Sequence, residues 1–139
     1  MPARFRRVAQ EDETGCGIAC IAMVTGRSYE SVKRLFERRI YRTSRRHLYT
    51  THGDLTRALT VLGIKSRRHQ FRRWRAIHEL AIVPMNRRAK GYWHWVVFLG
   101  DSKKPYVLDP NPDDTARRYD LRGAQARGLY VAVVPHALD

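Results

Sequence analysis

Apolar residues in the first part of the chain recur at helical spacing. Residues 16–24 are small or apolar at almost every position, which predicts a buried helix that ends at Gly26. Residues 28–38, which Ser28 can cap, carry apolar side chains on one face and charged side chains on the other. We therefore expect the second helix to be amphipathic and to dock on the first.

A third helix and then a change of pattern follow. Residues 42–51 are polar and have no clear period, which indicates a loop that leads into a helix over residues 55–62, ended by Gly63. Beyond this glycine the apolar positions form short extended runs divided by turn-forming segments. These runs predict strands at residues 64–71, 81–85, 93–99, 106–108 and 129–134, with a short helix at 74–80. The predicted helices precede the predicted strands along the chain. This order favours a single α+β domain over residues 1–139, with the helices packed on a mostly antiparallel sheet.

The composition describes a folded but strongly basic protein. The 139 residues include 27 Lys and Arg against 13 Asp and Glu, a formal net charge of +14, while 43% of the residues are hydrophobic. This hydrophobic fraction excludes a disordered polycation. No apolar run approaches the roughly 20 residues of a membrane-spanning helix, and the basic N-terminus is not followed by the apolar stretch of a signal peptide. We expect a cytoplasmic protein in a reducing compartment.

Cys16 is the most informative residue of the sequence. It lies between two glycines at the first turn of the first predicted helix, where the helix dipole and free backbone N–H groups stabilise a thiolate. The glycines also let a substrate carbonyl approach the backbone closely. Cys20, one turn further along the helix, fits a small buried core residue, and a disulfide between the two is sterically poor. Cys16 is therefore the candidate nucleophile, with a core position as the alternative.

A thiol nucleophile needs a base, and the base needs a group that holds its tautomer. His94 begins an apolar strand, where a polar ring requires a partner. The turn at residues 100–105 would fold the next strand back and bring Asp109 near His94. Gln10, which precedes the helix, could complete an oxyanion hole with the Cys16 N–H. No histidine lies at a metal-ligand spacing, so we expect no metal or organic cofactor.

Several short motifs occur in a specific order along the chain. They are Gln10, Gly15-Cys16-Gly17 with the apolar helix after it, Thr51-His52-Gly53, His94-Trp95-Val96-Val97 and Leu108-Asp109-Pro110. Together they resemble the C39 family of papain-like cysteine peptidases. The resemblance implies a papain-like fold with Cys16 as nucleophile, His94 as general base, Asp109 as orienting residue and Gln10 as oxyanion-hole donor. In that family the peptidase domain is fused to an ABC exporter and removes leader peptides after a Gly-Gly pair.

The sequence departs from that family in two respects. The family usually has an aspartate directly before the nucleophile, where this chain has Gly15. The chain also contains neither membrane spans nor the phosphate-binding loop of an ATP-binding domain. We therefore expect a stand-alone C39-like domain, for which the resemblance does not imply leader processing.

The reaction and the role of the charge stay open at this point. A Cys-His-Asp set suits hydrolysis of a peptide or amide bond, but equally release of ammonia from glutamine or acyl transfer to an amine. The basic surface would attract an acidic peptide or protein substrate, or nucleic acid on an inactive protease-like scaffold. Six cations between Lys65 and Arg75 interleave with aromatic residues, but no nucleic-acid-binding motif is recognisable. We expect a cysteine hydrolase, with nucleic-acid binding as the alternative and solubility as the plainest account of the charge.

Overall fold

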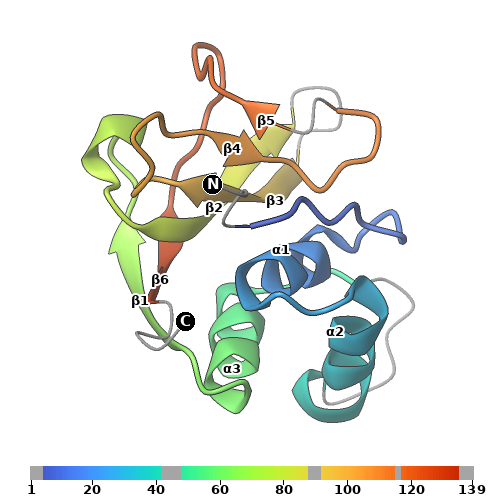
Figure 1. Cartoon of the computed structure of the whole chain (residues 1–139). Coiled ribbons are helices and arrows are strands. Elements are labelled where there is room, and N and C mark those ends of the chain that lie inside the picture. The colour runs from blue at the N-terminus through green and yellow to red at the C-terminus, as the bar shows by residue number, and fades with distance from the viewer. Residues whose placement is uncertain (1–4, 42–47, 88–91, 115–116, 135–139) are drawn as a thin grey trace.

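Three α-helices lie against one antiparallel sheet in the computed structural model, which describes residues 5–41, 48–87, 92–114 and 117–134 (Figure 1). The helical elements are α1 (Cys16–Thr25), α2 (Tyr29–Leu35), the π-helical turn η1 (Phe36–Ile40), α3 (His52–Val61) and the 3-10 turn η2 (Trp74–Ala76). The strands are β1 (Lys65–Gln70), β2 (Leu80–Arg87), β3 (Tyr92–Leu99), β4 (Val107–Leu108), β5 (Arg117–Arg118) and β6 (Leu129–Val134). Their order across the sheet is β1-β6-β2-β3-β4-β5, and every pair is antiparallel. The expected α+β class is confirmed.

The first two helices form where the apolar spacing predicts them. α1 is buried over residues 17–24, and Gly26 ends it in the left-handed conformation with φ 71°. The Ser28 hydroxyl accepts a hydrogen bond from the Ser31 N–H at 3.1 Å and caps α2. The helical turns then continue through η1 to Ile40, slightly beyond the expected end.

Helix α3 begins earlier than the expected Leu55. The Thr51 hydroxyl accepts a hydrogen bond from the Asp54 N–H at 3.1 Å, and the Asp54 carboxylate accepts one from the Thr51 N–H at 3.0 Å. This capping box satisfies backbone donors at the helix start, so the helix begins at His52. The earlier start puts His52 beside the pocket described below.

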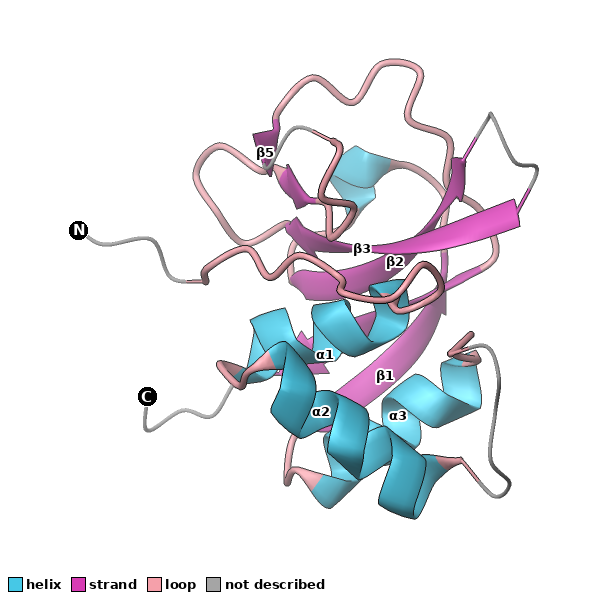
Figure 2. Cartoon of the chain, turned by 90° about the vertical axis from the view of Figure 1, so that its right-hand side faces the viewer, coloured by secondary structure: helices cyan, strands magenta, loops and turns pink. Residues whose placement is uncertain are grey.

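Successive side chains of the central strands point to opposite faces of the sheet, and this divides the core into two layers. On β3, Trp95, Val97 and Leu99 pack with the helices. Val96 and Phe98 point to the opposite face of the sheet, where Trp74 and other residues outside the main helices cover them. Figure 2 shows α1, α2 and α3 together on one side of the strands. Both faces of the central strands are therefore buried.

Two short elements differ from the sequence expectation. The helix expected at residues 74–80 is only the single turn η2, because Leu80 already pairs with β3 as the first residue of β2. Strand β5 was not expected, because two arginines carry no apolar pattern and their extended form depends on pairing with β4. The predicted loop at 42–51 lies partly outside the described residues. Within the described part of the chain, no helix has the length and apolar character needed to cross a membrane.

Candidate active site

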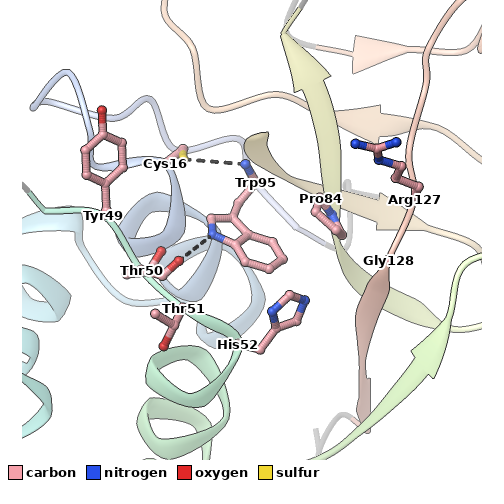
Figure 3. A pocket seen from close by; sticks show the side chains of 9 residues that line it. All are labelled: Cys16, Tyr49, Thr50, Thr51, His52, Pro84, Trp95, Arg127 and Gly128. Atoms are coloured by element: carbon pink, nitrogen blue, oxygen red, sulfur yellow. Dashed lines mark hydrogen bonds between the residues drawn. The ribbon is translucent and has the colours of Figure 1, made fainter. Parts of the chain in front are cut away.

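Cys16 is the first residue of α1 and lies against strand β3. Its sulfur accepts a hydrogen bond from the Trp95 N–H at 3.4 Å (Figure 3). The strand explains this contact: the Leu99 N–H donates to the Tyr106 carbonyl at 3.0 Å, and N–H groups two residues apart along a strand point to the same side. β4 ends at Leu108, before it reaches Trp95. The Trp95 N–H therefore has no partner strand on that side and meets the sulfur instead.

His94 and Asp109 form a buried pair beside this sulfur. Nε2 of His94 lies 2.6 Å from Oδ1 of Asp109, and the two residues are 2% and 6% exposed. Burial opposes the charged ring, but hydrogen bonds to Asp109 and to Cys16, together with their charges, outweigh it and raise the pKa of His94 to about 9. Because Nε2 faces Asp109, Nδ1 is the nitrogen left for Cys16.

The loop that carries Asp109 is held by the N-terminal segment. The Asn111 N–H donates to Asp109 Oδ1 at 2.8 Å, which closes a turn around the carboxylate. Arg7 donates through Nε to the Asp109 carbonyl at 2.7 Å and through its terminal nitrogen to the Asn111 carbonyl. The Gln10 N–H donates to the Pro110 carbonyl at 2.8 Å. Nothing in the local sequence distinguishes Arg7 from the neighbouring arginines, so its contact with the Asp109 loop could not be predicted.

The Gln10 side chain is buried and bonds to the backbone of the turn that precedes α1. Its Nε2 donates to the carbonyls of Asp12 at 3.0 Å and Glu13 at 2.8 Å, so both amide protons are used. Its Oε1 is buried and has no hydrogen-bond partner among the described residues. Donation to an oxyanion would require Gln10 to exchange one of these carbonyls for the substrate. In the structure the side chain shapes the turn that delivers Cys16.

Comparison with known proteins shows the family of the chain. A family model described as the peptidase C39 family matches residues 4–123. The chain belongs to the peptidase C39 family. The match includes Gln10, Cys16, His94 and Asp109, and it identifies the α+β fold as that of a C39 cysteine peptidase-like domain. A search of curated proteins found no match. Strand β6 lies beyond the matched residues, although it pairs with strands on both sides, β1 and β2.

Gly15 takes the place of the aspartate that usually precedes the nucleophile in C39 domains. A Cβ at position 15 would overlap the Tyr29 hydroxyl oxygen, so this chain has no room for a side chain there. The Tyr29 hydroxyl donates to Asp12 Oδ2 at 2.7 Å, and Lys33 Nζ donates to Asp12 Oδ1 at 3.1 Å. Burial and the Asp12 hydrogen bond raise the pKa of Tyr29. The Asp12 carboxylate thus ties the loop before Cys16 to helix α2.

A pocket of about 480 Å³ opens beside the sulfur in this C39 domain. Figure 3 shows its lining, which consists of Cys16, Tyr49, Thr50, Thr51, His52, Pro84, Trp95, Arg127 and Gly128. The Trp95 indole N–H donates to the Thr50 carbonyl at 3.0 Å, and its ring centroid lies 4.9 Å from that of His52. His52 Nε2 in turn lies 2.7 Å from the Leu129 carbonyl. These contacts hold the indole as a fixed apolar wall next to the nucleophile.

The two cysteines have different surroundings. Both are free thiols, but Cys16 is partly exposed and Cys20 is buried. Burial, and then the charges of Cys16 and Asp109, raise the pKa of Cys20 well above its ordinary value. Among the described residues, no group of three or more His, Cys, Asp and Glu side chains is placed to hold a metal ion.

Proposed function

We propose that this C39 domain is a cysteine peptidase that hydrolyses a peptide bond through Cys16, His94 and Asp109. The observation that carries the proposal is the buried 2.6 Å contact between His94 and Asp109, with the other ring nitrogen left for the Cys16 sulfur. Covalent acyl transfer needs a nucleophile next to a base, and a third group that orients the base. Cys16, His94 and Asp109 would take these three roles. The partly exposed sulfur also lines a pocket that a substrate can enter.

The first half of the reaction transfers the acyl group to sulfur. The raised pKa of His94, about 9, supports a resting state in which its ring is an imidazolium, and the reaction begins from the Cys16 thiolate. The thiolate attacks the scissile carbonyl carbon and a C–S bond forms. His94 gives its proton to the leaving nitrogen as the C–N bond breaks. Asp109 keeps the ring oriented and stabilises its charge at Nε2.

The second half restores the enzyme with water. His94, now neutral, removes a proton from water, whose oxygen attacks the thioester carbon. The C–S bond breaks, and the carboxylic acid product leaves with the oxygen of that water. The Cys16 N–H at the start of α1 is the expected oxyanion donor in both halves, because the helix N-terminus leaves it without a helical partner. Gln10 becomes a second donor if substrate displaces one of its carbonyl contacts.

The expected substrate is a peptide or protein, a segment of which enters the Cys16 pocket. The apolar wall made by Trp95 and Pro84 favours small or apolar groups next to the scissile bond. Arg127 lines the same pocket, and no acidic residue is among its described lining residues. Together with the net charge of +14, this charge favours an acidic peptide over a basic one.

A single experiment separates the peptidase from the other reactions that the same residues support. The purified protein and its Cys16→Ala variant are incubated with a mixed pool of synthetic peptides, and the products are identified by mass spectrometry. We expect new peptide ends, with one water added per cut, only from the unaltered protein. Conversion of glutamine to glutamate without cleavage would indicate a deamidase, and joining of peptides to amines would indicate an acyl transferase. Equal cleavage by both proteins would rule out Cys16 as the nucleophile.

A further inference from the structure

A larger hollow lies on the sheet face opposite to the helices. It has a volume of about 680 Å³. We call it the rear hollow, and it is lined by Arg73, Trp74, Arg75, Ile77, His78, Phe98, Gly100, Ser102, Lys103, Pro105, Tyr119, Leu121 and Arg122. Phe98 and Trp74 belong to the core layer that faces away from α1, whereas the Cys16 pocket includes Trp95 from the helix-facing layer. The rear hollow is therefore separate from the candidate active site.

Aromatic side chains in fixed positions line the rear hollow. The Trp74 indole N–H donates to the Ala124 carbonyl at 3.1 Å, and its ring centroid lies 4.9 Å from that of Phe98. Tyr119 is 42% exposed. Two residues that do not line the hollow contact the Tyr119 ring: the Tyr106 ring centroid lies 5.2 Å from that of Tyr119, and Lys104 Nζ lies over the Tyr119 ring at 4.6 Å from its centroid. An exposed ring held by its neighbours is a preformed surface on which another flat ring can stack.

Three of the cations that line the rear hollow have no acidic partner among the described residues. Arg73, Arg75 and Lys103 are exposed and form no ion pair with any described residue. Arg122 also lines the hollow, but it is paired with Asp120 at 2.8 Å. No acidic residue is among the described lining residues. The rear hollow is therefore suited to an anion.

The backbone brings these cations together from two separate loops. Gly100 donates its N–H to the Glu79 carbonyl at 3.1 Å, and a Cβ at position 100 would overlap the Ile77 carbonyl oxygen. Only a residue without a side chain permits this approach. The contact joins the loop after η2 to the turn after β3, so Lys103 lines the same hollow as Arg73 and Arg75.

We propose that the rear hollow binds a nucleotide unit, with the base on Tyr119 and the phosphate on Arg73, Arg75 and Lys103. An aromatic ring next to unpaired cations matches both parts of a nucleotide, since bases stack on aromatic side chains irrespective of sequence and phosphates bind guanidinium and ammonium groups. An acidic peptide would use the cations but leave the aromatic surface without a partner. The binding site is independent of Cys16 and is present whether or not the domain is a peptidase.

The test measures binding of two nucleotide sources to the full chain. Adenosine monophosphate is titrated by calorimetry, and a fluorescein-labelled oligothymidylate by anisotropy, both with the Cys16→Ala variant at physiological salt. We expect saturable binding of at least one probe. Binding of the oligonucleotide more than about ten-fold tighter than the mononucleotide assigns the site to single-stranded nucleic acid, because several units then contact the protein. Similar affinities assign it to a free nucleotide, and no binding of either probe overturns the proposal.

Two pairs of variants locate the site and its chemistry. Arg73→Glu with Arg75→Glu should weaken binding at least about ten-fold, whereas the charge-matched Arg38→Glu with Arg39→Glu, exposed on η1, should have a much smaller effect. Tyr119→Leu should weaken binding about ten-fold and Tyr119→Phe should preserve it. Equal losses from both arginine pairs would mean unspecific attraction by net charge. Unchanged binding in Tyr119→Leu, or equal competition by polyglutamate, would mean an anion site without base recognition, and either outcome overturns the proposal.

Discussion

His94 Nε2 and Asp109 Oδ1 lie 2.6 Å apart at a point where the sheet opens between β3 and β4. On its β3 side the short strand β4 pairs only with Val97 and Phe98, so the residues beyond its end are free to approach the start of α1. Asp109 lies directly after β4, and its Oδ1 accepts hydrogen bonds from His94 and from the Asn111 N–H. The carboxylate is thus fixed before substrate arrives, which is the condition for an oriented base.

Cys16 should react with an alkylating reagent much faster than Cys20. Cys16 is partly exposed and has a hydrogen bond from the Trp95 N–H, whereas burial raises the pKa of Cys20. A short pulse of limiting iodoacetamide followed by peptide mapping should find at least about ten-fold more label on Cys16. Unfolded protein, in which both thiols label alike, is the control. Equal labelling of the folded protein would contradict the assignment.

Alkylation and turnover should depend on the protonation of His94. Its pKa is raised from 6.5 to about 9, so the imidazolium that supplies the leaving-group proton is lost above about pH 9. We expect kcat/KM to fall on the alkaline side around that pH. For stability, a pKa raised by folding means that the contribution of His94 is complete below pH 6.5 and is lost as the pH rises through about 9.

Denaturant unfolding from pH 6 to pH 10 checks the stability part of this prediction. The difference in free energy of unfolding between the protein and its His94→Gln variant should shrink as the pH rises through about 9. A difference that is constant over this range would show that His94 titrates at its ordinary pKa. The same result would leave no basis for an imidazolium in the resting site.

Asp109→Asn should lower kcat/KM by about 100-fold or more without unfolding the protein. The amide can still bond to the His94 ring, but it favours the wrong tautomer and does not stabilise the imidazolium. The alkaline limb of the pH profile should therefore move to lower pH. Asp113→Asn, exposed on the same loop, is the matched control and should have almost no effect. Full activity in Asp109→Ala would remove this residue from the mechanism.

Gln10→Ala should distinguish a role in the oxyanion hole from a role in the turn before α1. An oxyanion donor acts in the transition state, so its loss should lower kcat by about 100-fold with little change in KM. A purely structural residue, bonded to Asp12 and Glu13 as observed, would instead lower the melting temperature. We expect both effects, and unchanged kcat would restrict Gln10 to the turn.

Gly15→Ala should destabilise the protein by about 1–3 kcal/mol, because the new Cβ overlaps the Tyr29 hydroxyl. Tyr29→Phe alone should cost about 1 kcal/mol through the lost hydrogen bond to Asp12. Combined, the two changes should cost less than their sum, because removal of the hydroxyl makes room for the methyl group. Denaturant unfolding of all four proteins measures this coupling, and strict additivity would contradict the steric account.

The sequence by itself determined the local features of this domain. The apolar spacing of α1, the Gly26 end and the Ser28 cap act within a few residues, so they can be identified from the sequence. The position of Cys16 at the first turn follows from the same local rules. The approach of His94 and Asp109 was also predictable, because one short turn separates their strands.

Only the tertiary structure decided contacts between segments that are distant along the chain. The Trp95 N–H reaches the Cys16 sulfur because β4 ends early, and Arg7 fixes the Asp109 loop from the other end of the sequence. The rear hollow joins three such segments, around Arg73, Lys103 and Tyr119, and nothing in the sequence shows that they meet. The spacing of apolar residues and the capping residues reflect interactions between residues that are close along the chain. The contacts named here depend instead on how the whole sheet brings its loops together.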